Sequence, residues 1–170
     1  MKYSVAGSVN EQLASLTPNE REGFNELREY WDSKKDEVVY DDYMILRLCR
    51  AFPAKDRFNI KIAKKVADRL ADWERSTGVL SITIEEVRPH LKNGCLVITG
   101  GYNKEGYQTL YMKPSLFFPG KDNLDDLIRS LCYLLQCMTL NERVSKAGIS
   151  FIANLDDWVG KIFPKGCSSI

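Results

Sequence analysis

Two stretches of sequence decide the fold of this chain: DNLDDLIRSLCYLLQCM at residues 122–138 and GISFIANL at residues 148–155. The first predicts an amphipathic helix, because its apolar residues recur every three or four positions; they are Leu124, Leu127, Ile128, Leu131, Leu134, Leu135 and Met138. The second is short and nearly all apolar. After a crossover helix it predicts a buried strand, parallel to the strand before the helix and joined to it with a right-handed connection.

Two further strands precede this unit. Residues 95–99 and 107–112 are rich in β-forming side chains, and the glycine-containing residues 100–106 between them predict a turn. Residues 114–120 predict a loop. The second half of the chain therefore reads as a hairpin, a crossover helix and a parallel strand.

The first half predicts helices. Thr17, Pro18 and Glu20 form a capping-box start for a helix through about Trp31. Asp41 opens a second helix that ends before Pro53. A third helix is predicted from about residue 59 to residue 75, with one apolar side that comprises Ile62, Ala63, Val66, Ala67, Leu70 and Trp73. Thr83 and Glu86 repeat the capping-box pattern ahead of a short fourth helix, which contains Pro89.

The fold class is therefore α/β, with a helical head at residues 17–94 and a smaller α/β lobe at residues 95–170. The lobe is expected to be incomplete, because residues 156–170 are too few for another helix and strand. The whole chain has 170 residues, enough for one domain with a small helical appendage.

Composition narrows the function classes. The formal net charge is +1, so no overall field would attract nucleic acid or coat a membrane. The five cysteines include no Cys-x-x-Cys pair and the N-terminus has no apolar run, which predicts a reduced, cytoplasmic protein. The most apolar stretch, residues 131–140, is far shorter than the roughly 20 residues that span a bilayer.

Four groups of residues resemble one protein family. One of them, Ala63, Val66 and Leu70 with Trp73-Glu74-Arg75, resembles the family helix that ends in a tryptophan-arginine pair. The stretch DDYMILRLCRA at residues 41–51 resembles the signature of an acidic pair followed by a Leu-Arg-x-Leu-Arg-Ala helix. Residues 101–114 resemble a hairpin whose second strand ends in a basic residue, here Lys113. Residues 148–155 with Trp158 resemble a central strand followed by a tryptophan. The family is CRAL-TRIO, and the resemblance covers about residues 26–158, after which the family's C-terminal half has no counterpart.

The resemblance implies a noncatalytic protein that holds one hydrophobic lipid in an apolar pocket, exchanges it transiently at a membrane surface, and needs no cofactor. The positions that match the family's lipid-facing positions are Met112, Ile128, Leu131, Leu135 and Ile149. From spacing alone, the same residues also fit an ordinary hydrophobic core. The alternative function is an interaction or regulatory module, in which a protein partner covers an unpaired strand edge and an apolar helix face.

Other chemistry has weaker support. His90 is the single histidine and lacks a spaced partner for a metal site or a catalytic pair, so no metal and no catalytic residue are predicted. Gly100-Gly101 lacks the remaining glycines of a dinucleotide site. Cys167 has the position of a prenylated cysteine, but two serines follow it in place of aliphatic residues. A local cationic band comprises Lys55, Arg57, Lys61, Lys64, Lys65 and Arg69, and interspersed aspartates favour a solvated helix face over a membrane-binding one.

Overall fold

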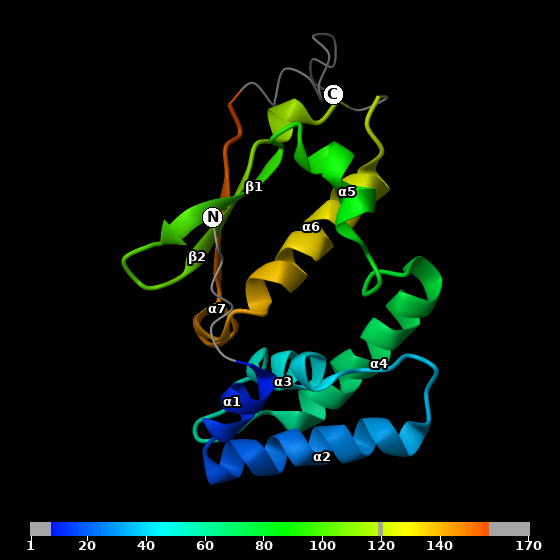
Figure 1. Cartoon of the computed structure of the whole chain (residues 1–170), viewed down its shortest axis with the longest axis vertical. Coiled ribbons are helices and arrows are strands. Elements are labelled where there is room, and N and C mark those ends of the chain that lie inside the picture. Colours follow the sequence, from blue (N-terminus) through cyan, green and yellow to red (C-terminus); the bar gives the residue numbers. More distant parts are fainter. Residues whose placement is uncertain (1–7, 119–120, 157–170) are drawn as a thin grey trace, which may run out of the picture. The chain divides into compact units, whose positions relative to one another are not determined.

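The computed structural model describes residues 8–118 and 121–156 (Figure 1). By their contacts these residues form two compact units. The helical unit comprises residues 8–81 and 138–146, and the sheet unit comprises residues 82–118, 121–137 and 147–156. The family-based division into residues 17–94 and 95–170 stays a prediction.

The helical unit is built from α1 (Val9–Ala14), α2 (Pro18–Lys34), α3 (Asp42–Arg50), α4 (Ile60–Thr77) and the short α7 (Glu142–Ala147). Each of the first four begins at a polar cap whose side-chain oxygen accepts a hydrogen bond from the backbone N–H three residues on; the caps are Ser8, Thr17, Asp41 and Asn59. The predicted starts of α2, α3 and α4 are confirmed. Neither α1 nor α7 was predicted.

The core of the helical unit lies between α2, α3 and α4. Large side chains come from α2 and α3, whereas α4 contributes mainly Ala63, Ala67 and Ala71. Such small side chains let helix axes approach closely. Trp31 stacks on Tyr40 with ring centroids 4.2 Å apart, and the Tyr40 hydroxyl donates a 2.8 Å hydrogen bond to the Ala67 carbonyl.

The predicted buried face of α4 is partly wrong. Ile62 and Trp73, which the sequence assigned to the packed side, are 42% and 40% exposed. The alanine row governs the packing because it permits the closest approach, and this row is rotated away from the two large side chains. Apolar spacing alone does not distinguish these two arcs of the helix.

The sheet unit contains β1 (Leu96–Tyr102), β2 (Gln108–Met112) and β3 (Ile149–Ala153), together with α5 (Ile84–Leu91), the 3-10 turn η1 (Pro114–Leu116) and α6 (Leu124–Thr139). The strand order is β1-β2-β3. β1 pairs antiparallel with β2, and β3 pairs parallel with β2, so the predicted hairpin, crossover helix and parallel strand are confirmed. Figure 1 shows α5 on one side of α6 and the sheet on the other.

The predicted turn at residues 100–106 is too long. β1 continues through Gly100 and Gly101 to Tyr102, and its pairing with β2 becomes irregular between Ile98 and Tyr102. Glycine within a strand commonly marks such a bulge. The actual turn closes where Asn103 N–H donates to the Tyr107 carbonyl at 2.8 Å.

The mixed α/β class with a helical N-terminal part is confirmed. Within the described residues, no helix has both the length and the apolar character that crossing a bilayer requires. Two residues named in the sequence analysis, Trp158 and Cys167, lie outside the described residues.

Candidate functional site

The long helix α6 carries two apolar faces with different surroundings. Ser130, Leu134 and Met138, spaced four residues apart, are buried. Ile128, Leu131 and Leu135 lie on a neighbouring stripe and keep contact with solvent; Leu131 and Leu135 are half-buried and Ile128 is 39% exposed. At about 100° per residue, these three side chains fall within about 60° of one another around the helix. We call them the open stripe of α6.

The polar side of α6 is joined to α5. Arg129 pairs with Glu86 at 2.8 Å, and His90 Nε2 lies 3.5 Å from Asp126 Oδ2. Around the helix, Asp126 lies about 170° and Arg129 about 130° from the centre of the open stripe. The open stripe therefore points away from the ion pairs that join α6 to α5.

The Glu86 carboxylate also serves as the reciprocal part of the cap of α5. The backbone N–H and the hydroxyl of Thr83 both donate to it, and Arg129 donates from α6. The hydrogen bonds from Thr83, followed by Arg129, hold the pKa of Glu86 below its usual value. Glu86 thus remains charged near neutral pH and keeps α5 attached to the polar side of α6.

The strand register places two of the predicted lipid-facing residues on one face of the sheet. Leu110 pairs with Phe151, Met112 with Ala153, and Ile149 with Gln108. Paired residues share a face and alternate residues along a strand return to it, so Met112, Ile149, Leu110 and Phe151 all lie on the same face. Leu110 is fully buried, Met112 and Ile149 are half-buried, and Phe151 is 52% exposed.

The prediction that residues 149–155 form a buried strand is wrong. Phe151 and Ile152 point to opposite faces of the sheet, and each is about half exposed, at 52% and 50%. In the part of the chain that the structure describes, β3 has a neighbour only on its β2 side. A parallel strand is buried when both faces of its sheet are covered, and the exposure of Phe151 and Ile152 shows that both faces remain partly open at β3.

The five predicted residues thus form two accessible apolar groups. Ile128, Leu131 and Leu135 come together on α6, and Met112 and Ile149 come together on the sheet. None of the five lines any of three hollows described next. One of about 350 Å³ lies in the helical unit beside Gly23 and Phe58 and has mostly polar walls, another is formed by α5 and Lys92, and a third, of about 10 Å³, lies beside His90 and Ser130.

No model of a known protein family matches the chain. No curated protein matches its sequence either.

The described residues include neither a metal site nor an activated thiol. Among the described residues, no group of three or more His, Cys, Asp or Glu side chains could hold a metal ion. Burial raises the pKa of the Cys49 thiol to about 12, and it also raises the pKa of Cys95 and Cys132. These thiols are therefore protonated at neutral pH and are poor nucleophiles.

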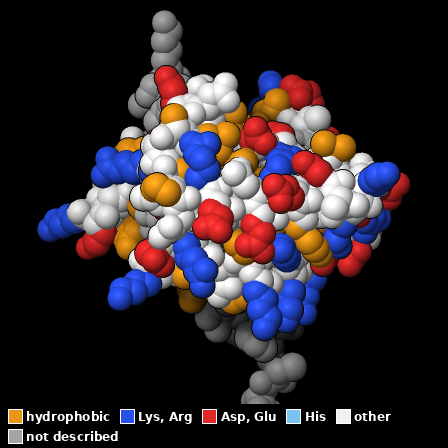
Figure 2. Space-filling view, turned by 90° about the horizontal axis from the view of Figure 1, so that it is seen from below, with side chains coloured by type: hydrophobic (Ala, Val, Ile, Leu, Met, Phe, Trp, Pro, Cys, Tyr) orange, Lys and Arg blue, Asp and Glu red, His pale blue; other side chains and the backbone are white. Residues whose placement is uncertain are grey.

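The cationic band of the helical unit is interrupted by acidic partners. Lys64 pairs with Glu26 at 2.7 Å and its ammonium lies 5.0 Å from the centre of the Tyr30 ring. Nearby, Lys34 pairs with Asp68 at 2.6 Å. Figure 2 shows Lys and Arg side chains interspersed with Asp and Glu over the face it presents. These observations favour a solvated surface for the band.

One polar cluster was missed by sequence reasoning. Arg50 is 8% exposed, and its guanidinium donates to Gln12 Oε1 at 2.7 Å and contacts Glu142 Oε1 at 3.4 Å. Glu142 also accepts from Ser15 at 3.0 Å and pairs with Lys146 at 2.7 Å. We call these five residues the Arg50 cluster. It joins α1 and α3 to α7, the segment between α6 and β3.

The Arg50 cluster keeps the Glu142 carboxylate charged. The hydrogen bond from Lys146, followed by that from Ser15 and by the charge of Arg50, holds the pKa of Glu142 below its usual value.

Of the two helices that the sequence analysis did not predict, only α1 has a sequence signal, which is the Ser8-x-x-Glu11 capping box ahead of it. The burial of Arg50 had no such signal, since it lies in the family-like signature helix and arginine is mostly exposed.

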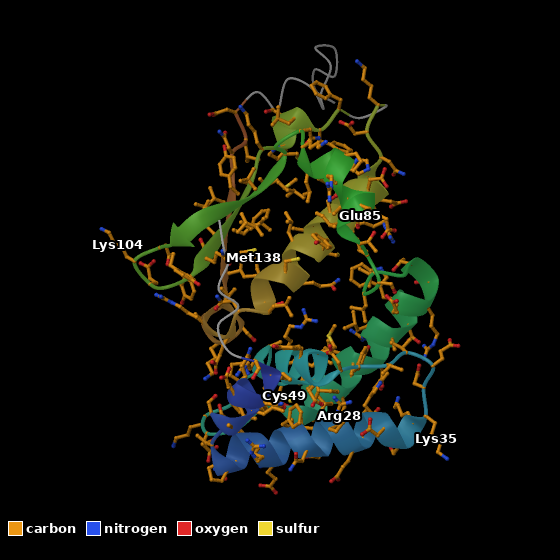
Figure 3. All side chains as sticks on the ribbon, in the orientation of Figure 1. Arg28, Lys35, Cys49, Glu85, Lys104 and Met138 are labelled. Carbon is orange, nitrogen blue, oxygen red and sulfur yellow. The ribbon has the colours of Figure 1, made fainter. Side chains whose placement is uncertain are left out.

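A second arginine joins α2 to the start of α3. Arg28 donates to the Tyr40 carbonyl at 2.7 Å and pairs with Asp42, the first residue of α3. Figure 3 shows Arg28 and Cys49 in the region between α2 and α3, whereas Lys35 and Lys104 point outward. The acidic pair at residues 41–42 therefore has two structural roles, a helix cap at Asp41 and an arginine partner at Asp42.

Proposed function

We propose that this chain binds a hydrophobic lipid noncatalytically, as the CRAL-TRIO resemblance implies, and that it exchanges this lipid at a membrane surface. The binding residues are Met112, Ile128, Leu131, Leu135 and Ile149. Buried free thiols such as Cys49 suit a reducing compartment, and we place the protein in the cytoplasm.

One observation carries the proposal: the open stripe of α6 is apolar and yet accessible. An ordinary core residue on a helix of this length would be buried, as Leu134 is. The open stripe points away from the ion-paired α5, and the sheet of the same unit carries a half-buried apolar surface at Met112 and Ile149. A fatty chain laid along these side chains would gain about 0.8 kcal/mol for each methylene removed from water.

The test is lipid retention by the purified protein. The protein is incubated with fluorescently labelled fatty-acyl lipids and vesicles and then separated by gel filtration. We expect labelled lipid to co-elute with the wild-type protein and Ile128→Asn to reduce the amount retained. The matched control is Ile62→Asn, because Ile62 has a similar exposure on a helix of the other unit, 42% against 39%. No retention by a folded wild-type protein, or an equal loss in both variants, would refute the proposal.

A second function is favoured by β3. Its outer edge has no strand partner in the described chain, and Phe151 and Ile152 expose apolar surface on both faces. Open strand edges pair readily with other chains. We propose as the alternative that this edge binds a protein. Binding of a protein that requires β3 and occurs without any retained lipid would support this alternative. A chain that remains monomeric and binds none of the proteins added to it would contradict it.

A further inference from the structure

The polar hollow of the helical unit, with a volume of about 350 Å³, lies between α2 and the segment that leads into α4. Its α2 wall includes Glu22 and Gly23, and the facing wall includes Arg57, Phe58 and Lys61. Pockets that hold small molecules measure about 300–1,000 Å³ and are mostly apolar. This hollow therefore has the size for a small molecule, and its mostly polar walls suit a polar one.

Two polar contacts join the facing walls. Asn19 Nδ2 donates to Asp56 Oδ2 at 3.3 Å, and Lys64 pairs with Glu26 at 2.7 Å. Asn19 and Glu26 lie about one helical turn before and one turn after Glu22 on α2. The two contacts therefore hold the walls on either side of Glu22.

The wall opposite α2 is fixed by its own backbone. Phe58 pairs with Pro53 in an antiparallel bridge, and the Ala54 N–H donates to the Arg57 carbonyl at 2.7 Å. The Phe58 side chain is 6% exposed, which anchors the wall in the core of the unit. Arg57 thus projects from a short, closed turn.

Three charged side chains of the hollow have no partner in the part of the chain that the structure describes. Glu22, Arg57 and Lys61 make neither an ion pair nor a side-chain hydrogen bond there. Their neighbours Glu26 and Lys64, in contrast, neutralise each other. Opposite charges that share a hollow without touching are each available to one group of a ligand placed between them.

These three charges determine which ligand fits. Arg57 and Lys61 offer two cations to carboxylates, and Glu22 offers one carboxylate to an ammonium group. Two positive charges and one negative charge give the three side chains a net charge of +1. An acidic amino acid carries the opposite set, two carboxylates and one ammonium group.

We infer that the hollow binds an acidic amino acid, with its carboxylates on Arg57 and Lys61 and its ammonium group on Glu22. A guanidinium binds a carboxylate through two parallel hydrogen bonds, and a lysine ammonium binds as a point charge. A dicarboxylate without the ammonium group would meet the Glu22 carboxylate and be repelled. The hollow belongs to the helical unit and the lipid-binding residues belong to the sheet unit, so this inference and lipid binding fail independently.

The first experiment is an NMR titration of the ¹⁵N-labelled full chain with sodium L-glutamate. Exposed charge pairs are individually weak, so we expect a dissociation constant of about 1 mM and titrate to about 20 mM. Sodium chloride at equal ionic strength is the blank. We expect saturable shifts of the Gly23 and Lys61 amide signals, and shifts no larger than those of the blank would overturn the inference.

Two related compounds test the charge pattern. Glutarate lacks the ammonium group, and L-glutamine lacks one carboxylate. We expect each to bind at least fivefold more weakly than glutamate. Equal binding of either compound would overturn the assignment of the three charges.

Matched substitutions locate the site. Glu22→Gln and Lys61→Gln should each weaken glutamate binding at least fivefold, and Glu22→Gln should also abolish the preference for glutamate over glutarate. The controls are Glu29→Gln on α2 and Lys65→Gln on α4, because both residues are exposed and neither lines the hollow. Equal weakening by the controls would reduce the effect to general charge screening and overturn the inference. Circular dichroism verifies that each variant is folded.

Discussion

Replacement of Glu142 by glutamine should destabilise the helical unit strongly for a single-atom change. The Arg50 side chain that Glu142 faces is 4% exposed, and the Glu142 side chain itself is 26% exposed. Removing one partner of a buried ion pair costs about 3–5 kcal/mol, because the remaining charge stays buried. Glutamine keeps a hydrogen-bonding oxygen and Glu142 is partly solvated, so we expect a loss of about 2–3 kcal/mol in the free energy of unfolding.

The assay is urea unfolding followed by the NMR signal of the Trp31 indole N–H, which is buried in the helical unit and donates to the Val38 carbonyl at 3.0 Å. Glu85→Gln provides the control, because Glu85 pairs with Arg88 on the surface, where both side chains are more than half exposed. That substitution should change the free energy of unfolding by less than about 1 kcal/mol. A loss below about 0.5 kcal/mol for Glu142→Gln would show that the Arg50 cluster does not hold α7 in place.

Three further outcomes follow from the same geometry. The pKa of Glu142 is lowered in the folded state, so its stabilisation is complete above the ordinary carboxyl pKa and is lost as the pH falls below about 4.5; Glu142→Gln should flatten the acid limb of a stability–pH curve. Because burial raises the pKa of Cys49 to about 12, iodoacetamide at pH 8 should modify the exposed Cys137 while Cys49 stays unmodified, as peptide mass spectrometry would show. Gly78 ends α4 at φ 62°, so Gly78→Ala should lower the stability of the helical unit by about 1 kcal/mol, and an unchanged denaturation midpoint would contradict this.

Local chemistry explains why most helix starts could be predicted. A hydroxyl or carboxylate cap such as Thr17 or Asp41 acts on backbone groups three residues away, so the sequence contains all of the interacting parts. The parallel pairing of β3 was also predictable, because a crossover helix leaves few other connections.

Burial depends on partners that are remote in sequence, and here prediction failed. The apolar sequence of β3 predicts a buried strand, but the exposure of Phe151 depends on which remote elements cover the faces of the sheet. The short α7 has too few turns for a clear periodicity. The salt bridge between Arg50 and Glu142 joins residues 92 positions apart, so no local sequence pattern predicts it.

The candidate site was predicted in part. Helical spacing places Ile128, Leu131 and Leu135 together, and the structure confirms this grouping. Spacing could not tell the open stripe from the buried face that includes Leu134, because both are apolar and they adjoin on one helix. The ion pairs between α5 and α6 show which side of α6 points away from α5.

Photolabelling with a lipid that carries a diazirine in its acyl chain is the most direct test of lipid binding at the open stripe. The labelled protein is digested and the modified residues are identified by mass spectrometry, with unlabelled lipid added as competitor. We expect competitor-sensitive labels within Leu124–Thr139 and Ile149–Ala153. Labels confined to other segments, or labelling that competitor does not reduce, would contradict the account.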